Sequence, residues 1–535
     1  MRRAAALVVA TLGVLIAFPG FAGAHAGLDN SIPAASSVLA EGPDTIVLDF
    51  DEPIESTLAS IDLFDDTAER IEVGEAVAVG GDGSIVSAPV PELDDGTYAV
   101  VWRVTSLDGH VIDGAFSFQV GTSTGDGAGL LDRVSGDAAG DPTVGLLTDI
   151  ARFVAFVGMV LFVGAGMFAA LAPSQLDASS ASRRLVVTGA VLTVMAALAA
   201  YGLYAAAAVG GSLGDAFSAD AWGKVASTRT GRFLLVRLVL SALSVAVLAT
   251  ARRRSSSWWQ SAAVAVSIGL VMTFPAAGHP SAATPAALWQ VLDGVHFGFV
   301  VVWLGGLVLF TLGGRAWFRD TEGEAVVRRF STIATVAVPV IVVTGTLQAI
   351  ELAGGLDAIT ETDWGRRLLV KVSIVAVLVA LGGVSRWLLR ASGAASLRRT
   401  VAAEAVVGLL VLGVTAAMLD LPPVAVAKSQ VFNTAITEAG VLADVTVTPG
   451  RVGTNEVHVV LTPPGGSLTP IVAATARVAL PERDIPAAPV ELTLIGSNHY
   501  TGVITFPYTG QWRLDLVVEV TAGSTVLLRT TIPVP

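Results

Sequence analysis

The sequence contains no cysteine. This absence excludes disulfides, thiolate zinc sites, iron–sulfur clusters and cysteine nucleophiles together. Histidine and methionine are also scarce, with six of each, so they compete with carboxylates and backbone amines for any metal. A Gly-rich phosphate loop with its lysine is missing too, which argues against ATP-driven pumping by this chain. No nucleophile with an oriented base is visible either, so we expect a non-enzymatic protein.

Charged residues are few, at 14%, while 53% of the chain is hydrophobic. Ordinary soluble domains carry roughly 25% charged residues, so these values predict an integral membrane protein. Residues 25–145 differ from the rest, because they hold 23 acidic residues and only three arginines. Such a segment does not bind nucleic acid. Its acidity either keeps the segment soluble or concentrates cations at an extracellular surface.

The N-terminus has the pattern of a secretory signal peptide over residues 1–24. Two arginines follow Met1, an apolar run covers 4–19, and small residues occupy 22–24. Cleavage would make His25 the first residue. An uncleaved anchor is the alternative, although its apolar run is shorter than the ~20 residues that span a bilayer.

Two regions of short alternating strands flank the centre of the chain. The first, residues 25–120, predicts an Ig-like β-sandwich with strands at 45–50, 60–64, 97–104 and 115–120. A Gly/Asp-rich linker composition over 121–148 follows it. After Pro422 and Pro423 the pattern returns, at 456–461, 490–494 and 512–520, and predicts a second β-sandwich over 424–535.

Residues 149–423 contain eight apolar stretches of membrane-spanning length and predict an eight-helix bundle. The stretches are 150–172, 183–209, 232–250, 258–277, 289–313, 331–350, 367–388 and 400–419. The loops expected inside carry 13 arginines, whereas the outer loops at 210–231, 278–288 and 351–365 carry only Lys224 and Arg229. The positive-inside rule therefore places both β-domains outside a bacterial cytoplasmic membrane.

An internal repeat supports this count. The segment TGRFLLVR at 230–237 resembles WGRRLLVK at 364–371, and each begins the third helix of a set of four. The spans therefore predict a 4+4 duplication, which is common in membrane transporters.

A histidine at the mature N-terminus can chelate a metal through its α-amine and ring together. Asp108 and His110, at i and i+2, would project to one face of a strand. With His25 they offer four donors suited to tetragonal Cu(II). Two unrelated histidines on a β-domain remain the alternative.

These residues lie within a pattern that resembles the CopC copper-binding domain over its full length. The matching segments are residues 25–33, 47–53 and 102–118, the last containing Asp108-Gly109-His110. The resemblance implies that His25, Asp108 and His110 bind Cu(II). Some CopC members also have a Met-rich Cu(I) loop, but residues 25–145 contain no methionine. This departure favours a Cu(II)-only site.

Ionisable residues also occur at the outer ends of two predicted spans. His279 closes the fourth span, while Asp293 and His296 share one face of the fifth, with Trp303 on the same side. Such residues often mark ion paths. A hydrogen-bonded pair at a helix end is the alternative for Asp293 and His296.

Residues 149–423 resemble the CopD membrane domain, and the resemblance implies that His279, Asp293 and His296 bind copper, as Cu(I) or Cu(II). Met272, about two turns before His279, is a further thioether candidate, although methionine more often fills gaps in a core. Arg152, Arg237, Lys371 and Glu404 near span ends are interpreted as snorkelling or paired residues.

Residues 447–458 resemble the YtkA-like β-domain, which often follows CopD. His458 and His499 lie in this region as possible accessory ligands. Neither has a partner at convincing spacing, so we predict no site for them.

The resemblance as a whole implies a CopC–CopD fusion in copper homeostasis or resistance. It would capture copper outside the cell and transport it, most simply inward, with copper ions, the lipid bilayer and other extracytoplasmic copper carriers as partners. One alternative is a membrane redox protein in which His279 and His296 bind haem and Cu(II) is reduced. Another is a copper receptor or buffer that transports nothing.

Overall fold

The computed structural model describes residues 27–121, 127–138, 141–171, 179–250, 256–278, 285–313, 315–318, 321–353, 362–392, 397–419, 432–464, 470–483, 485–496 and 498–534. Positions 36, 40, 51, 82 and 449 within these ranges are excepted, and 280, 359 and 421 are described in addition. The predicted signal peptide, His25 and His279 lie outside the described residues.

The N-terminal domain is a sandwich of two sheets, as predicted. One sheet has the order β1-β3-β7-β6, formed by Leu28–Ile32, Thr45–Phe50, Ile85–Pro89 and Val77–Val79. The other has the order β2-β9-β8-β4-β5, formed by Val38–Leu39, Val111–Val120, Gly96–Thr105, Ser60–Phe64 and Arg70–Ile71. Alternating side chains such as Ile46, Leu48 and Phe50 meet Trp102 and Phe118 in the core between the sheets.

The region expected to be a linker contains a helix. Helix α2 (Gly127–Ala138) packs Leu130 and Val134 onto Ala99 and Val101 of β8. The Gly and Asp content of this segment is typical of a linker, and only two apolar residues, at i and i+4, indicate a helix. The helix is stabilised because these two residues pack on the sheet. The segment 121–148, predicted to be a Gly/Asp-rich linker, thus contains both α2 and the start of the first membrane helix, at Pro142.

Eight helices are long and apolar enough to cross a membrane, which confirms the predicted number for the described residues. The first, Pro142–Ala170, comprises α3 (Pro142–Met159), a π-helical turn (Val160–Gly164) and α4 (Ala165–Ala170). The others are α6 (Ser180–Ala208), α8 (Arg229–Ala249), α9 (Ser257–Ala276), α10 (Ala286–Leu312), α11 (Thr321–Ala353), α12 (Asp363–Ser392) and α13 (Arg398–Met418). Short helices η3 (Leu213–Phe217) and α7 (Ala219–Ala226) connect α6 to α8.

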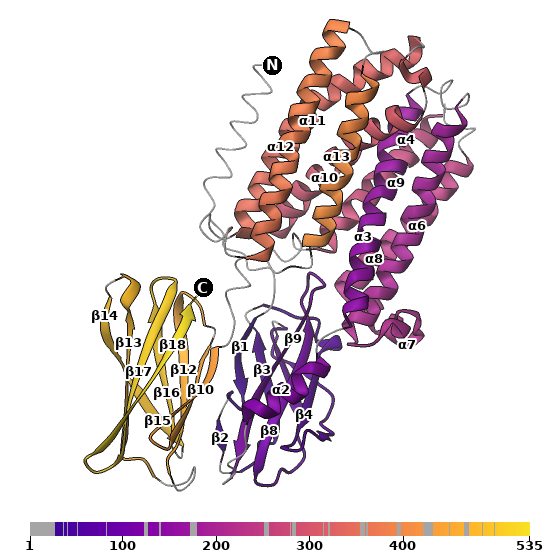
Figure 1. The fold of residues 1–535 in the computed structure, drawn as a ribbon. Coiled ribbons are helices and arrows are strands. Elements are labelled where there is room, and N and C mark those ends of the chain that lie inside the picture. Colours follow the sequence, from indigo (N-terminus) through magenta and orange to yellow (C-terminus); the bar gives the residue numbers. More distant parts are fainter. Residues whose placement is uncertain are drawn as a thin grey trace.

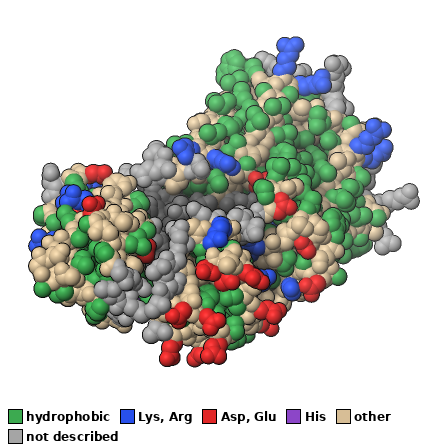
Figure 2. Space-filling model, turned by 60° about the horizontal axis from the view of Figure 1, so that its bottom comes forward, with side chains coloured by type: hydrophobic (Ala, Val, Ile, Leu, Met, Phe, Trp, Pro, Cys, Tyr) green, Lys and Arg blue, Asp and Glu red, His purple; other side chains and the backbone are tan. Residues whose placement is uncertain are grey.

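Hydrophobic side chains cover the outside of the helix bundle, and acidic side chains gather on the surface below it (Figure 2). Val191, Val239 and Val336 are each more than half exposed on different helices. A surface of this kind is stable in hydrocarbon rather than in water. The structure is therefore consistent with a membrane-embedded bundle.

The two repeated segments have the same local structure. The Thr228 hydroxyl accepts a hydrogen bond from Gly231 N at the start of α8, and the Thr362 hydroxyl accepts one from Gly365 N at the start of α12, both at 3.0 Å. A side-chain carbon added at either glycine would lie 1.8 Å from a carbonyl oxygen six residues earlier. The resemblance at 230–237 and 364–371 thus reflects one helix-start structure used twice.

The C-terminal domain is a second two-sheet sandwich. One sheet has the order β10-β11-β12-β16-β15, formed by Phe432–Glu438, Val441–Thr448, Gly453–Thr462, His499–Phe506 and Leu492–Gly496. The other has the order β14-β13-β17-β18, formed by Ile485–Val490, Ala473–Leu480, Gly510–Thr521 and Ser524–Val534. The strand expected over 490–494 is confirmed only in part: residues 492–494 lie in β15, whereas Val490 ends β14, and the chain passes from one sheet to the other at Glu491.

Both β-domains lie at the same end of the helix bundle (Figure 1). The N-terminal domain lies below α3, α6 and α8, and the C-terminal domain lies beside it. The N-terminal domain therefore lies against this end of the helix bundle.

Candidate functional site

Asp108 and His110 lie in the hairpin turn between β8 and β9. Asp108 is 2% exposed, and its Oδ1 accepts hydrogen bonds from the Ser106 hydroxyl and from His110 N at 3.1 Å. The same oxygen lies 2.9 Å from His110 Nδ1. The two side chains do converge. They meet as neighbours in a turn, however, whereas the sequence predicted that they would share one face of a strand. Gly109, at φ +90°, provides the left-handed backbone for that turn.

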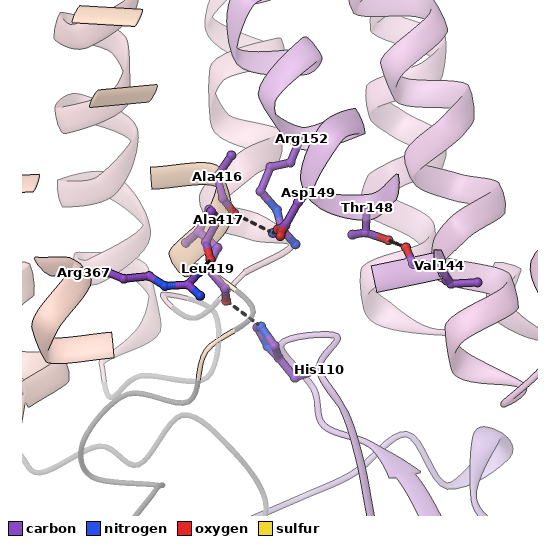
Figure 3. Close-up of polar contacts among 9 residues, drawn as sticks. All are labelled: His110, Val144, Thr148, Asp149, Arg152, Arg367, Ala416, Ala417 and Leu419. Carbon is purple, nitrogen blue, oxygen red and sulfur yellow. Dashed lines mark hydrogen bonds and ion pairs between the residues drawn. The ribbon is translucent and has the colours of Figure 1, made fainter. Parts of the chain in front are cut away.

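This turn contacts the end of α13. His110 Nε2 lies 3.2 Å from the Leu419 carbonyl oxygen, and Figure 3 shows the ring pointing from the β-domain toward the helix end. The nearby carbonyl oxygens of Ala416 and Ala417 accept hydrogen bonds from the side chains of Arg152 and Arg367. The last carbonyls of a helix lack partners within the helix and carry partial negative charge. His110 therefore completes the cap of α13.

Three further contacts hold the N-terminal domain on the bundle. Glu55 Oε1 accepts a hydrogen bond from Arg229 N at the start of α8, at 2.5 Å. The Arg103 guanidinium covers Gly210 after α6, where a side-chain carbon would lie 1.4 Å from Nη1. Leu58 is 6% exposed and packs into an apolar cluster that includes Tyr201, Val225 and Leu234 of the helices.

Two carboxylates at this contact have altered acidity. Burial raises the pKa of the Glu55 carboxyl, although Arg229 N–H and the Arg232 and Arg229 charges oppose the shift. Burial also raises the pKa of Asp113, against the Arg103 charge. Removing a carboxylate from water favours its neutral form. The contact is therefore strongest when these groups are protonated.

A cavity of about 1040 Å³ runs from the turn into the bundle. Its lining includes Asp108 and His110 at one end and Asp293, His296 and Trp303 among the helices. Most of the remaining wall is apolar, and it is formed by α3, α6, α8, α9, α10, α11, α12 and α13. The two groups of predicted ligands thus face one continuous space.

Asp293 and His296 are each held by α11. Gln348 Nε2 donates a hydrogen bond to Asp293 Oδ1 at 3.2 Å. His296 Nδ1 lies 2.8 Å from the Thr344 hydroxyl, which itself donates to the Val340 carbonyl at 2.7 Å. Because that proton is already used, Thr344 accepts from His296 Nδ1–H. In this tautomer the Nε2 atom of His296 carries the lone pair of the neutral ring.

A glycine makes room for the His296 ring. A side-chain carbon at Gly345 would lie 2.9 Å from His296 Cε1, which is closer than such atoms approach. Met272 behaves differently, because its Sδ atom packs on Gly294 of α10 and the cavity wall does not include it. Packing thus accounts for Met272, and its role as a copper ligand stays a prediction.

Three cations that the sequence analysis assigned to snorkelling or pairing line the cavity: Arg152, Arg237 and Lys371. Arg237 is buried, donates to Thr273 through Nε and Nη2, and lies 3.9 Å from the centre of the Phe274 ring. Lys371 interacts electrostatically with Asp293. Arg237 and Lys371 occupy equivalent positions of the two repeated segments. This equivalence is the feature of the sequence that indicates that both line the cavity. Glu404 instead accepts a hydrogen bond from Ser385 between α13 and α12.

The C-terminal histidines, which the sequence analysis left without a partner, contact each other. His458 Nδ1 lies 3.1 Å from His499 Nε2. Pairing of β12 with β16 brings them together, and the 41 residues between them hid this contact. Among the described residues, however, no group of three or more histidines, aspartates or glutamates is placed to hold a metal ion.

Fold and site together define a multi-pass membrane protein with a β-domain over the mouth of its cavity. The CopC domain family matches residues 28–121. The family of copper resistance protein D matches 324–418, and that of the copper resistance protein D-like N-terminal domain matches 143–284. The chain belongs to these families as a CopC–CopD fusion.

Several individual proteins are similar to this chain. The copper transport protein CutJ of Bacillus subtilis is 26% identical over 452 residues, covering 82% of each chain. Copper resistance protein C of Pseudomonas syringae pv. tomato is 32% identical over 126 residues, or 22% of this chain and 98% of that one. The crystal structure of CopC from Methylosinus trichosporium OB3b has 30% identity and a TM-score of 0.17, covering 18% of this chain and 93% of that chain.

Proposed function

We propose that the N-terminal domain captures Cu(II) outside the cell with His25, Asp108 and His110, and that the helix bundle then moves copper inward across the cytoplasmic membrane. The continuous cavity between Asp108–His110 and Asp293–His296 is the observation that supports this proposal most strongly. A receptor that only stores copper has no use for such a connection.

The contact of His110 with Leu419 suggests how copper leaves the capture site. One ring nitrogen of His110 faces Asp108 and the other faces a helix carbonyl, so neither is free for a metal in this arrangement. A Cu(II) ion on His110 competes with the cap of α13. Docking therefore favours release of copper at the mouth of the cavity, and undocking favours capture.

Inside the bundle, His296 Nε2 and the Asp293 carboxylate are the proposed receiving ligands. His279, which lies outside the described residues, is proposed as a third ligand. Arg152, Arg237 and Lys371 add positive charge to the same cavity. Their repulsion keeps a copper ion from binding tightly there, and transport requires that an ion both enter and leave.

Both β-domains lie at one end of the bundle, and the arginine-rich loops predict that this end is extracytoplasmic. Copper import follows from this orientation, since the capture domain covers the outer mouth. Met272 is a lesser candidate on the same route.

Copper entry into proteoliposomes that contain the full chain tests the proposal. The protein is oriented with the β-domains outside the vesicle, and Cu(II) is added to the outer solution. The rate of copper entry is compared with that of His296→Ala and His110→Ala. We expect copper entry in the unaltered protein and at least a tenfold lower rate in both variants. Copper entry that is no faster in any of the three than in protein-free liposomes supports a receptor or buffer instead. A haem spectrum in the purified protein supports the redox alternative.

A further inference from the structure

Two buried histidines face each other in the C-terminal domain, outside the capture site and the membrane cavity. His458 lies on β12 and His499 on the neighbouring strand β16, with 8% and 5% of their surfaces exposed. The ring centres are 5.3 Å apart, and the Nδ1 atom of His458 is 3.1 Å from the Nε2 atom of His499.

The strand pattern places these rings on the side of the sheet away from the core. Val457, Val459 and Leu461 of β12 belong to the core, so His458 between them faces the other way. On β16, Tyr500 and Ile504 belong to the core. Since His458 pairs with Thr501 and Val460 pairs with His499, the two histidines are diagonal neighbours on one face.

A carboxylate fixes the orientation of one ring. Glu456 Oε1 lies 3.2 Å from His458 Nε2 and accepts a hydrogen bond from the Thr501 hydroxyl at 3.0 Å. A proton on Nε2 satisfies this carboxylate and leaves the Nδ1 lone pair of His458 directed at His499. Carboxylate–histidine pairs hold metal-binding imidazoles in this way and raise their basicity.

Burial disfavours the charged form of both rings. Burial lowers the pKa of His499 to about 4, and the nearby His458 adds to that shift. Burial also lowers the pKa of His458, with Glu456 opposing the shift. Without metal, His499 Nε2–H donates to His458 Nδ1. When His499 instead carries its proton on Nδ1, two lone pairs converge on the space between the rings.

We propose that His458 and His499 form a two-coordinate Cu(I) site in the C-terminal domain, oriented by Glu456. Metal–nitrogen bonds of roughly 2.0–2.1 Å require the nitrogens to separate to about 4 Å. Small rotations of the two side chains from the 3.1 Å contact provide this separation. Linear coordination by two imidazoles suits Cu(I), whereas structural Zn²⁺ requires four ligands. The described residues offer no third histidine or carboxylate in position to complete such a set.

Anaerobic Cu(I) titration of the full chain, against a chromophoric Cu(I) chelator, tests this proposal. The background variant is His110→Ala with His296→Ala, which removes one ligand from each of the other two proposed sites. We expect this background to bind one Cu(I) more tightly than the same protein carrying His458→Gln or His499→Gln. X-ray absorption of the bound metal should report two nitrogen ligands. Identical Cu(I) stoichiometry and affinity with and without either glutamine, or binding of Zn²⁺ but not Cu(I), would overturn the proposal.

A milder variant guards against loss of folding. Glu456→Gln keeps the two imidazoles and an acceptor for Thr501 but removes the charge, and it should weaken Cu(I) binding roughly tenfold. Thr501→Val is the matched control, because it removes the hydroxyl that donates to the same carboxylate while both imidazoles and the Glu456 charge are kept. A purely structural histidine pair predicts no Cu(I) binding in the background variant at all. Copper entry through the bundle does not depend on this site, so the two proposals fail independently.

Discussion

His110 Nε2 lies 3.2 Å from the carbonyl oxygen of Leu419, so a proposed copper ligand of the CopC domain also caps the last helix of the CopD domain. The same helix end is capped by Arg152 and Arg367 (Figure 3). In the proposed mechanism, copper capture and domain docking use the same side chain. Copper binding by the N-terminal domain is thereby coupled to its docking on the helix bundle.

Leu58 should anchor the docked state. Its side chain packs among helix residues, so Leu58→Ala removes apolar contact worth about 2 kcal/mol from docking while the core of the β-domain stays intact. We expect a wider distance distribution between spin labels on the two domains, measured by pulsed electron resonance, and tighter Cu(II) binding, because undocking releases His110 from the Leu419 carbonyl. Val77→Ala, on an exposed strand of the same domain, is the matched control. An unchanged distance distribution in Leu58→Ala would contradict this role.

Docking should weaken as pH rises. Glu55 faces Arg229 and Arg232 of α8 and Tyr204 of α6, and burial raises its pKa above the ordinary 4.5. A raised pKa means that the docked state favours the neutral acid. The contact is therefore fully formed below pH 4.5 and loses stability as pH rises through the raised value.

Glu55→Gln separates charge from hydrogen bonding at this contact. The amide keeps an acceptor for Arg229 N–H and lacks the titrating group. We expect the docked fraction of this variant, measured with the same spin labels, to fall less with rising pH than that of the unaltered protein, with the remaining loss due to Asp113. A pH dependence as large in Glu55→Gln as in the unaltered protein would assign the titration to another group.

Gly345 should control the position of His296. A methyl group at this position meets the ring at 2.9 Å and must displace it, although no ligand atom is removed. Gly345→Ala should therefore lower copper entry by an order of magnitude with normal expression and thermal stability. In Gly298→Ala the added carbon lies 3.7 Å from Val271, an ordinary contact, so its copper entry should match the unaltered protein. Equal rates of copper entry in Gly345→Ala and Gly298→Ala would contradict a role of Gly345 in transport.

The two repeated helix starts should contribute equally to stability. Thr228 and Thr362 accept equivalent hydrogen bonds, so alanine at either position should reduce the free energy of unfolding by about 1 kcal/mol. Thermal unfolding of both variants in the same detergent provides the comparison. A large effect at one threonine with none at the other would contradict structural equivalence of the repeats.

The sequence predicted elements whose signal is local. Eight apolar stretches predicted the number of membrane-spanning helices. The alternation of apolar and polar residues predicted β3 and β4 with the bounds that are observed. Features that depend on packing were missed. Helix α2 owes its stability to the sheet that Leu130 and Val134 cover, so its own composition predicted a linker.

The candidate site divides in the same way. The spacing of Asp108 and His110 revealed a pair, but only the turn hydrogen bonds show how they meet. Contact between His458 and His499 depends on strand register across 41 residues, which the sequence does not display. Arg237 and Lys371 were visible as a repeat, yet their common cavity required the helix packing.

Copper accumulation in cells that lack other uptake routes tests the central claim most directly. Cells expressing the unaltered protein are compared with cells expressing His296→Ala, and with Gly298→Ala as the neighbouring control, at equal protein levels. The account predicts that His296→Ala loses accumulation and that Gly298→Ala retains it. Accumulation that is unchanged in His296→Ala, or higher, would contradict inward transport through this site.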